Sequence, residues 1–307
     1  MATLFCLIAG GAGKEIAQEP ATTFKTGITQ VHVDVLVTNE KGSIANLKRE
    51  DFVIQDDGQP VSINSFGHDA ASLSVLLLLD VSGSMKDYVA QIGQRALSLL
   101  QQLRPADKVA IMGFAKESDY LMPFTSNMDR AAHAIDQALR PGLFPAGTSI
   151  NAALVDAAQA FIDSPEQIGH RAIFILTDNK ALNFRVTDDA VLRKLFAADT
   201  LLNAIVTKNA EPPKPLKTNR QQNPDFSWAD VFKLAKESGG EVLRTDRADE
   251  AFLKLLSNMR ERYLLTYNVP NAAPRQYHQI RVSLSKEAQK RSGKVVIRAR
   301  SGYYTGA

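Results

Sequence analysis

The chain has few of the features that would place it in several common functional classes. It contains a single cysteine, Cys6, in 307 residues, so no disulfide framework is expected. The apolar stretch 2–13 is too short to cross a bilayer as a helix, which needs about 20 residues. The 36 basic and 33 acidic side chains give a net charge of +3 with no long basic run, which argues against nucleic-acid binding. The five histidines form no pair at metal-ligand spacing, so no zinc site built on histidine is expected.

What the chain does have is a 45% hydrophobic composition, typical of a globular protein with one large domain or two of ordinary size. The apolar stretch 2–13 is typical of a signal-peptide core, and Ala17 and Gln18 offer a cleavage point, although a basic start is missing. We therefore expect residues 1–22 to be a leader and the protein to be periplasmic, cell-surface or secreted, without membrane insertion of the mature chain. A cytosolic location remains the alternative.

The run from Val75 to Ser84 is the most informative segment. Its unbroken aliphatic residues predict a strand buried on both faces, with Asp80 at its carboxyl end, where open α/β sheets place their ligands. Ser82 and Ser84 follow in a loop before a helical pattern begins. These side chains offer only oxygen, which favours Mg²⁺, Mn²⁺ or Ca²⁺ over zinc.

Two later segments complete this pattern. Thr148 stands in a loop at the start of a helical run, and Asp178 ends a second buried strand, 172–178. The order Asp-x-Ser-x-Ser, loop Thr, strand-end Asp resembles the metal-ion-dependent adhesion site of von Willebrand factor A domains. The resemblance covers roughly residues 70–262 and implies that Asp80, Ser82, Ser84, Thr148 and Asp178 together hold a divalent cation.

The flanking segments extend the resemblance. Residues 23–66, with Asp56-Asp57-Gly58-Gln59-Pro60, and residues 263–304, ending in Arg300-Ser301-Gly302-Tyr303-Tyr304, are similar to the ends of acidobacterial VWFA-related domain proteins. The biological role of that family is poorly defined, so the resemblance informs the prediction of the fold more than the prediction of the function.

Periodicity predicts how the chain is organised. Alternation over 31–37 and an Asp57-Gly58 hairpin indicate antiparallel strands near the amino terminus, and period-two strands return at 264–269, 280–284 and 295–300. Strands and helices alternate between them. The fold class is therefore α/β, a doubly wound, mostly parallel sheet (70–262) inserted between segments 23–69 and 263–307, which pair into a β-sandwich-like domain. The expected middle elements are strands 109–114, 201–206 and 241–244, helices 127–139, 189–198, 228–237 and 249–262, and a Pro-rich surface excursion over 211–224.

Simpler explanations of the site residues must be weighed. Asp80, Ser82 and Ser84 would also serve as helix caps, and Thr148 and Asp178 as cap and turn residues. In addition, the strand-end Asp of A domains is usually followed by Gly, whereas Asn179 and Lys180 follow here. Asn tolerates a positive φ, but an ammonium near the cation opposes its binding unless Lys180 turns to solvent or pairs with Asp188 or Asp189. We expect Asn179, Lys180 and Phe144 on the partner-binding rim.

The function indicated is binding without catalysis, in which the cation captures an Asp or Glu of a protein or peptide partner. A structural envelope or assembly protein with a merely stabilising metal is the alternative. A Mg²⁺-dependent haloacid-dehalogenase-like phosphatase is less favoured, because Ser82 stands where such enzymes need a second Asp as general acid.

Overall fold

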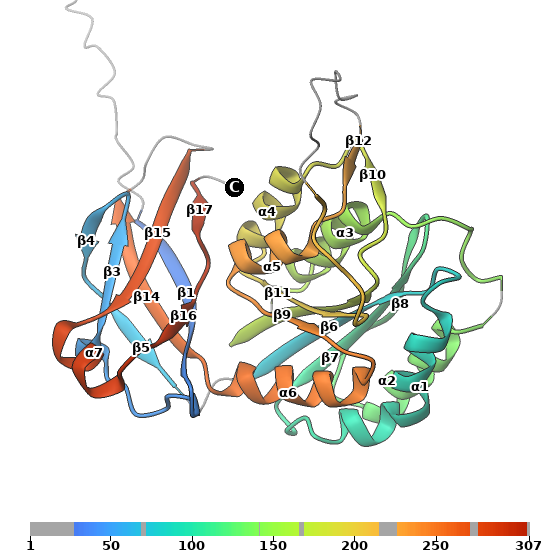
Figure 1. Cartoon of the computed structure of the whole chain (residues 1–307), viewed down its shortest axis with the longest axis horizontal. Helices are drawn as coiled ribbons and strands as arrows, with labels where there is room; N and C mark the ends of the chain where they lie inside the picture. The colour runs from blue at the N-terminus through green and yellow to red at the C-terminus, as the bar shows by residue number, and fades with distance from the viewer. Residues whose placement is uncertain are drawn as a thin grey trace, which may run out of the picture.

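A buried mixed sheet is at the centre of the larger of two units in the computed structural model (Figure 1). The structure describes residues 28–68, 72–140, 142–165, 169–214, 226–270 and 276–305. The expected leader and most of the Pro-rich excursion lie outside these residues. Among the described helices, none is long and apolar enough to cross a membrane.

The six strands of this sheet are arranged in the order β13-β11-β9-β6-β7-β8. All neighbours are parallel except the antiparallel pair β7 and β8. The chain begins in the centre with β6, moves to one edge, and then crosses to β9 on the other side. The carboxyl ends of β6 and β9 thus lie beside the point where the winding direction reverses, which is where ligands bind in open α/β sheets. The strands are β6 (Leu73–Asp80), β7 (Lys108–Phe114), β8 (Ser118–Thr125), β9 (His170–Thr177), β11 (Leu201–Val206) and β13 (Val242–Arg244).

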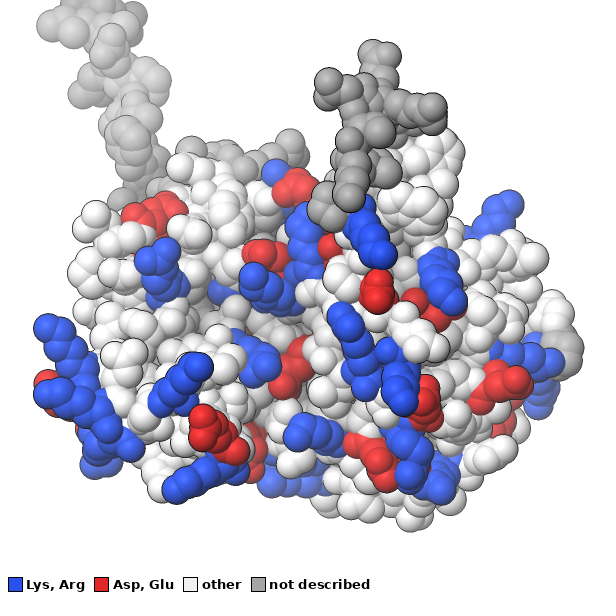
Figure 2. All heavy atoms as spheres, in the orientation of Figure 1, with Lys and Arg blue, Asp and Glu red and all other residues white. Residues whose placement is uncertain are grey.

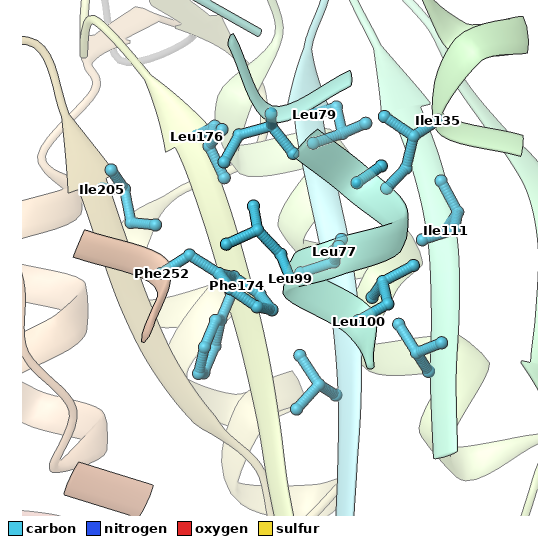
Figure 3. Packing of buried hydrophobic residues seen from close by; sticks show 14 of the residues in the cluster. Leu77, Leu79, Leu99, Leu100, Ile111, Ile135, Phe174, Leu176, Ile205 and Phe252 are labelled. Carbon is cyan, nitrogen blue, oxygen red and sulfur yellow. The ribbon is translucent and has the colours of Figure 1, made fainter. Parts of the chain in front are cut away.

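Helices cover both faces of the sheet, so its central strands are buried throughout. One hydrophobic cluster packs α1 (Lys86–Leu100), α2 (Met128–Ala138) and α6 (Ala248–Arg260) on one face. A second packs α3 (Ile150–Ile162), α4 (Asp188–Ala197) and α5 (Val231–Ser238) on the other. Alternate residues of β6 belong to the two clusters. Leu77 and Leu79 face the first (Figure 3), and Leu76 and Leu78 face the second.

The second unit is built from both flanking segments. Strand β1 (Ile28–Asn39) pairs with β14 (Tyr263–Pro270), and β3 (Phe52–Asp56) pairs with β15 (Tyr277–Leu284), all antiparallel. The resulting sheets, β16-β1-β14-β5 and β17-β15-β3-β4, share one hydrophobic cluster. The remaining elements are β2 (Gly42–Ser43), a 3-10 turn (Arg49–Asp51), β4 (Gln59–Val61), β5 (Ser65–Gly67), α7 (Lys286–Ser292), β16 (Val296–Arg298) and β17 (Gly302–Tyr304).

Several sequence predictions need correction. Trp228 does not begin a helix: it ends β12 (Phe226–Trp228), which pairs with β10 (Leu182–Phe184), a two-stranded ribbon that periodicity did not reveal. The helix starts at Val231 because the Asp230 side chain accepts from the Lys233 N–H and so caps it. Strand β8 was also missed, since most of its residues are partly exposed and give no apolar run.

Candidate metal centre

Asp80 occupies the position predicted for it, fully buried at the last residue of β6. Its Oδ1 accepts from the Ser82 N–H at 3.1 Å, and its Oδ2 accepts from the Thr177 hydroxyl at 2.7 Å. Thr177 ends the neighbouring strand β9, so the carboxylate is held between the two strand ends. Sequence reasoning missed Thr177; its place just before Asp178 at the end of a buried strand is the signal that would have identified it.

The serines do not cap the following helix. Ser82 and Ser84 lie in a turn in which the Met85 N–H donates to the Ser82 carbonyl at 2.9 Å, and the N-terminus of α1 receives no side-chain hydrogen bond. The Ser82 hydroxyl is buried and makes no hydrogen bond of good geometry among the described residues, although it lies close enough to Asp80 to lower the pKa of that carboxyl; Ser84 is exposed. The capping explanation therefore accounts for neither serine.

Thr148 also fails as a helix cap. Helix α3 has Ser149 at its N-cap position and makes no side-chain capping bond. Backbone bonds bring this loop to the site, because the Ser149 N–H donates to the Ala115 carbonyl at 2.8 Å and the Val81 N–H donates to the Phe114 carbonyl at 2.8 Å. Thr148 thus lies in a loop fixed to the end of β7, the strand beside β6.

Asp178 is buried directly after β9 and is paired with Lys180. Its Oδ1 accepts from the Lys180 N–H at 3.0 Å, and its Oδ2 lies 3.7 Å from the Lys180 Nζ. Neither Asp188 nor Asp189 pairs with Lys180 among the described residues; Lys233 and Arg193 hold those carboxylates. The ammonium therefore lies beside a candidate metal ligand, although the Lys180 side chain is 75% exposed.

The three residues expected on the rim are placed differently from one another. Asn179 has a φ of 60°, the left-handed conformation that Asn tolerates, but its side chain is buried rather than on the rim. It donates to the Glu211 carbonyl at 3.0 Å and accepts from the Val231 N–H at 3.1 Å, so it joins the end of β9 to α5. Lys180 is exposed at the rim, and Phe144 is half-buried with its ring over Gly113 in β7.

Charge and burial favour a cation at this edge. Burial raises the pKa of Asp80, and the nearby charge of Asp178 raises it further, while hydrogen bonds involving Ser82 and Thr177 act in the opposite direction. Two acidic side chains enclosed at adjacent strand ends are costly unless a positive charge accompanies them. A divalent cation would supply that charge, and the unpartnered Ser82 hydroxyl would supply a ligand atom. The donor set is all oxygen and so fits a hard cation.

A second cluster of possible ligands lies in the β-rich unit. Ligand atoms of Asp56, Asp57 and His278 lie within 4.8 Å of one another. The His278 Nδ1 is 2.9 Å from an Asp57 oxygen, and the Tyr267 and Tyr303 hydroxyls donate to Asp56 Oδ2. These bonds brace the Asp57-Gly58 turn against β15, which accounts for the closeness of the three side chains, although Asp56 Oδ1 and His278 Nε2 have no hydrogen-bond partner among the described residues.

Comparisons with known proteins found chains similar to this one. The uncharacterized protein YfbK of Escherichia coli (strain K12) is 27% identical over 192 residues, which is 61% of this chain and 31% of that protein. The chain thus spans about a third of that relative's length. Among solved structures, an aerotolerance-related membrane protein of Bacteroides fragilis is 22% identical, with a TM-score of 0.48, over 62% of this chain and all of that one.

A further solved structure, proximal thread matrix protein 1 of the mussel byssus with a zinc-occupied MIDAS motif, is 14% identical, with a TM-score of 0.46, over 67% of this chain and 49% of that one. Residues 75–180, which run from within β6 to just past β9 and include all five predicted ligands, match the family model of the von Willebrand factor type A domain. The larger unit therefore has the α/β fold of von Willebrand factor type A domains, and residues 75–180 are similar to that family in sequence.

Proposed function

We propose that this protein is a metal-dependent protein-binding module of the adhesion or assembly type, without catalytic activity. A divalent cation, Mg²⁺ or else Mn²⁺ or Ca²⁺, would be held by Asp80, Ser82, Ser84, Thr148 and Asp178. A carboxylate from an Asp or Glu of a partner protein would complete its coordination. We further propose that binding takes place outside the cytoplasm, on the basis of the signal-like leader in the sequence.

The observation that carries the proposal is the buried pair of strand-end carboxylates beside an unpartnered buried hydroxyl. Asp80 is fully buried, Asp178 is nearly so, and the Ser82 hydroxyl has no partner among the described residues. Buried polar groups in folded proteins are almost always paired, so an unpaired one at such a site points to a ligand.

The ligand set explains why a partner acid would bind. Two protein carboxylates only balance a divalent charge, and the hydroxyls of Ser82, Ser84 and Thr148 are neutral. The cation therefore remains electrophilic enough to accept a third carboxylate. Lys180 tunes this balance, because its ammonium lies 3.7 Å from Asp178 Oδ2 and competes with the cation for that oxygen.

Metal titration of two matched serine variants tests the proposal. Ser84→Ala removes an exposed candidate ligand without disturbing the core, and Ser98→Ala removes an exposed serine of α1 whose hydroxyl donates only to the Arg95 carbonyl. Calorimetry with Mg²⁺ or Mn²⁺ should show one cation bound per wild-type chain. Ser84→Ala should bind the cation about tenfold more weakly, as expected for the loss of one ligand contact, and Ser98→Ala should bind it as wild type does. No ion uptake by the wild-type protein would refute the proposal.

The same titration separates adhesion from a purely stabilising metal. Once the cation binds, an acidic probe, acetate or an Asp-containing peptide, should bind to the loaded protein and not to protein in chelator. If the cation raises the unfolding temperature but the loaded protein binds no carboxylate probe, the metal has only a structural role.

A further inference from the structure

The β10–β12 ribbon carries an exposed apolar face beside the candidate metal centre. Cross-strand pairs Leu182 with Trp228 and Phe184 with Phe226 place four large apolar side chains on its outer face, each at least 43% exposed. The Phe184 and Phe226 rings lie 5.0 Å apart, and the Arg185 guanidinium lies 4.8 Å over the Phe184 ring. A contiguous exposed patch of this kind marks a binding surface more often than a random feature.

The ribbon is hydrogen-bonded to the rest of the larger unit on its inner side. Asn183, which faces inward, is buried, and its Oδ1 accepts from the Asn151 N–H at the start of α3 at 3.1 Å. The Ala229 N–H donates to the Ala181 carbonyl at 3.0 Å and extends the ladder toward the site. In Figure 1 the ribbon projects from the larger unit at the end opposite α6. A fixed, outward-facing aromatic surface binds with little loss of conformational entropy.

A hollow connects the ribbon to the candidate metal centre. It has a volume of about 340 Å³, and its lining includes Asn179 and Lys180 from the loop after Asp178 as well as Trp228 from the ribbon. For comparison, an engineered cavity of about 150 Å³ is enough to hold benzene. The hollow therefore has room for an apolar or aromatic side chain.

Charge around the hollow favours an acidic partner. Lys180 and Lys214 line it together with one acidic residue, Glu211. On the face shown in Figure 2, by contrast, basic and acidic side chains are interspersed. A cationic rim next to an apolar surface complements a segment that carries both a carboxylate and an apolar side chain, and a recessed hollow fits a side chain better than a flat lipid surface.

We propose that the ribbon and hollow bind the apolar side chain of a partner segment whose Asp or Glu is bound at the metal centre. This inference rests on the proposed function, because it assigns the carboxylate to the cation. Asp178 and Leu182 are four positions apart, which limits the span between the two subsites to about 14 Å at full extension. The partner segment should therefore carry its acid and its large apolar residue within about four positions of each other.

Selection of displayed random 12-residue peptides on the full-length protein in Mg²⁺ tests this proposal. The same selection uses Trp228→Ser and, as a matched control, Leu253→Ser, which removes a 40%-exposed apolar side chain from α6. Wild type and the control should both enrich peptides with an Asp or Glu and a large apolar residue within four positions. Because Trp228 is the only tryptophan, its fluorescence reports directly on binding of peptides that lack tryptophan.

The expected results are quantitative. Selected peptides should shift the Trp228 fluorescence emission and protect it from quenching by iodide in Mg²⁺, and should do neither in chelator. Phe226→Ser and Trp228→Ser each remove a central aromatic contact and should weaken peptide binding at least about tenfold. Binding to Trp228→Ser is measured with labelled peptide. Leu253→Ser should weaken peptide binding less than about twofold.

Other outcomes would overturn the proposal in distinguishable ways. Acidic peptides that bind in Mg²⁺ without an apolar preference, equally well to Trp228→Ser, would leave the proposed function standing and refute the role of the ribbon. Apolar peptides that bind equally in chelator would refute the link to the metal. Dimers that form with rising concentration and are lost in Phe226→Ser would assign the surface to a second copy of the chain. Binding to phosphatidylcholine–phosphatidylglycerol vesicles that is stronger than binding to peptides would assign it to a lipid surface. If iodide quenches Trp228 only after residues 215–225 are replaced by a Gly-Ser linker, the surface is covered by that segment of the chain.

Discussion

Two regions of this protein that contain buried polar groups satisfy them very differently. At the junction of the two units, the Arg300 guanidinium donates to Asp199 Oδ1 and to the carbonyls of Gly302, His32 and Phe196, at 2.9 to 3.3 Å. At the strand-end site, the Ser82 hydroxyl has no partner among the described residues. The junction holds its charges with protein atoms, whereas the strand-end site leaves a hydroxyl unsatisfied, as the proposed metal site would require.

The junction also contains one exception. The side chain of Arg262 is fully buried there and donates to the Gly239 carbonyl at 2.6 Å, but its Nε has no partner among the described residues. Burial lowers the pKa of Arg262. The contrast between the two regions therefore rests on Arg300 and its partners, and the predictions below test it from the largest expected effect to the smallest.

Removing Arg300 should have the largest effect on stability. Arg300→Met removes the donor to three carbonyls and to Asp199, whose side chain is 35% exposed and keeps its bond from His32. Leaving such acceptors unsatisfied costs about 3 kcal/mol of the free energy of unfolding. Urea unfolding measures the loss, which should be the same with and without Mg²⁺. Lys208→Met, which removes an exposed ion pair with Asp246, should change stability by less than about 0.5 kcal/mol. A cost below 1 kcal/mol for Arg300→Met would contradict the description of the junction.

Removing the charge of Asp80 should abolish stabilisation by the cation. At a Mg²⁺ concentration of about 100 times the Kd, wild type should gain about 2.7 kcal/mol in the free energy of unfolding, and Asp80→Asn should gain none. In chelator the variant should be at least as stable as wild type, because it no longer buries a carboxylate without a counter-ion. Thermal melts in Mg²⁺ and in chelator check both statements. Asp87→Asn, an exposed change on α1, should retain the full Mg²⁺ effect.

Removing the ammonium of Lys180 should strengthen cation binding. Lys180→Ala frees Asp178 Oδ2 from a competing positive charge, and because the lysine is largely exposed the gain should be modest, about two- to fivefold in Kd. Calorimetry measures it. Lys233→Ala, which breaks the pair with Asp188, should not alter the Kd. Weaker binding to Lys180→Ala would show that this lysine supports the site instead of opposing the cation.

The smallest effect should come from His32, and it should depend on pH. The hydrogen bond to Asp199 raises the pKa of His32 above 6.5, while the pKa of Asp199 is lowered, because the hydrogen bond from His32 and the charge of Arg300 outweigh burial. The raised histidine pKa stabilises the fold fully below pH 6.5, and this stabilisation disappears as the pH rises through the folded-state value. The lowered Asp199 pKa adds stability above about pH 4, which is lost as the pH falls further.

His32→Gln should therefore cost up to about 1 kcal/mol at pH 5.5, discounted for its exposure, and progressively less toward pH 8.5. Urea unfolding across this pH range checks the slope, and the exposed His133→Gln should show none of it. A cost that stays constant with pH would show that the His32 ring acts through packing alone.

Much of the fold follows from local patterns in the sequence. The aliphatic run at 75–79 and the run 172–176 predicted fully buried strands, and these form the centre of the sheet as β6 and β9. The Asp57-Gly58 turn has φ values of 49° and 81°, as its hairpin signature requires. Such features depend on neighbours within a few residues, so periodicity and turn chemistry reveal them.

The candidate site was only partly predictable. The residue types and their order gave Asp80 and Asp178 at strand ends, and the structure places them there. That Lys180 pairs with Asp178, that Asn179 is buried against Glu211 and Val231, and that Thr177 holds Asp80 did not follow from spacing. Each depends on which of several nearby groups a flexible side chain reaches in three dimensions.

By itself, the sequence determined the alternation of buried strands and helices, the oxygen-only chemistry at two strand ends, and the hairpin of the amino-terminal segment, because each is encoded by side chains close together in the chain. Only the tertiary structure decided that β10 and β12 meet as an aromatic ribbon beside the site and that Arg300 joins the two units. Both depend on contacts between residues more than 40 positions apart, which come together only when the whole core has packed.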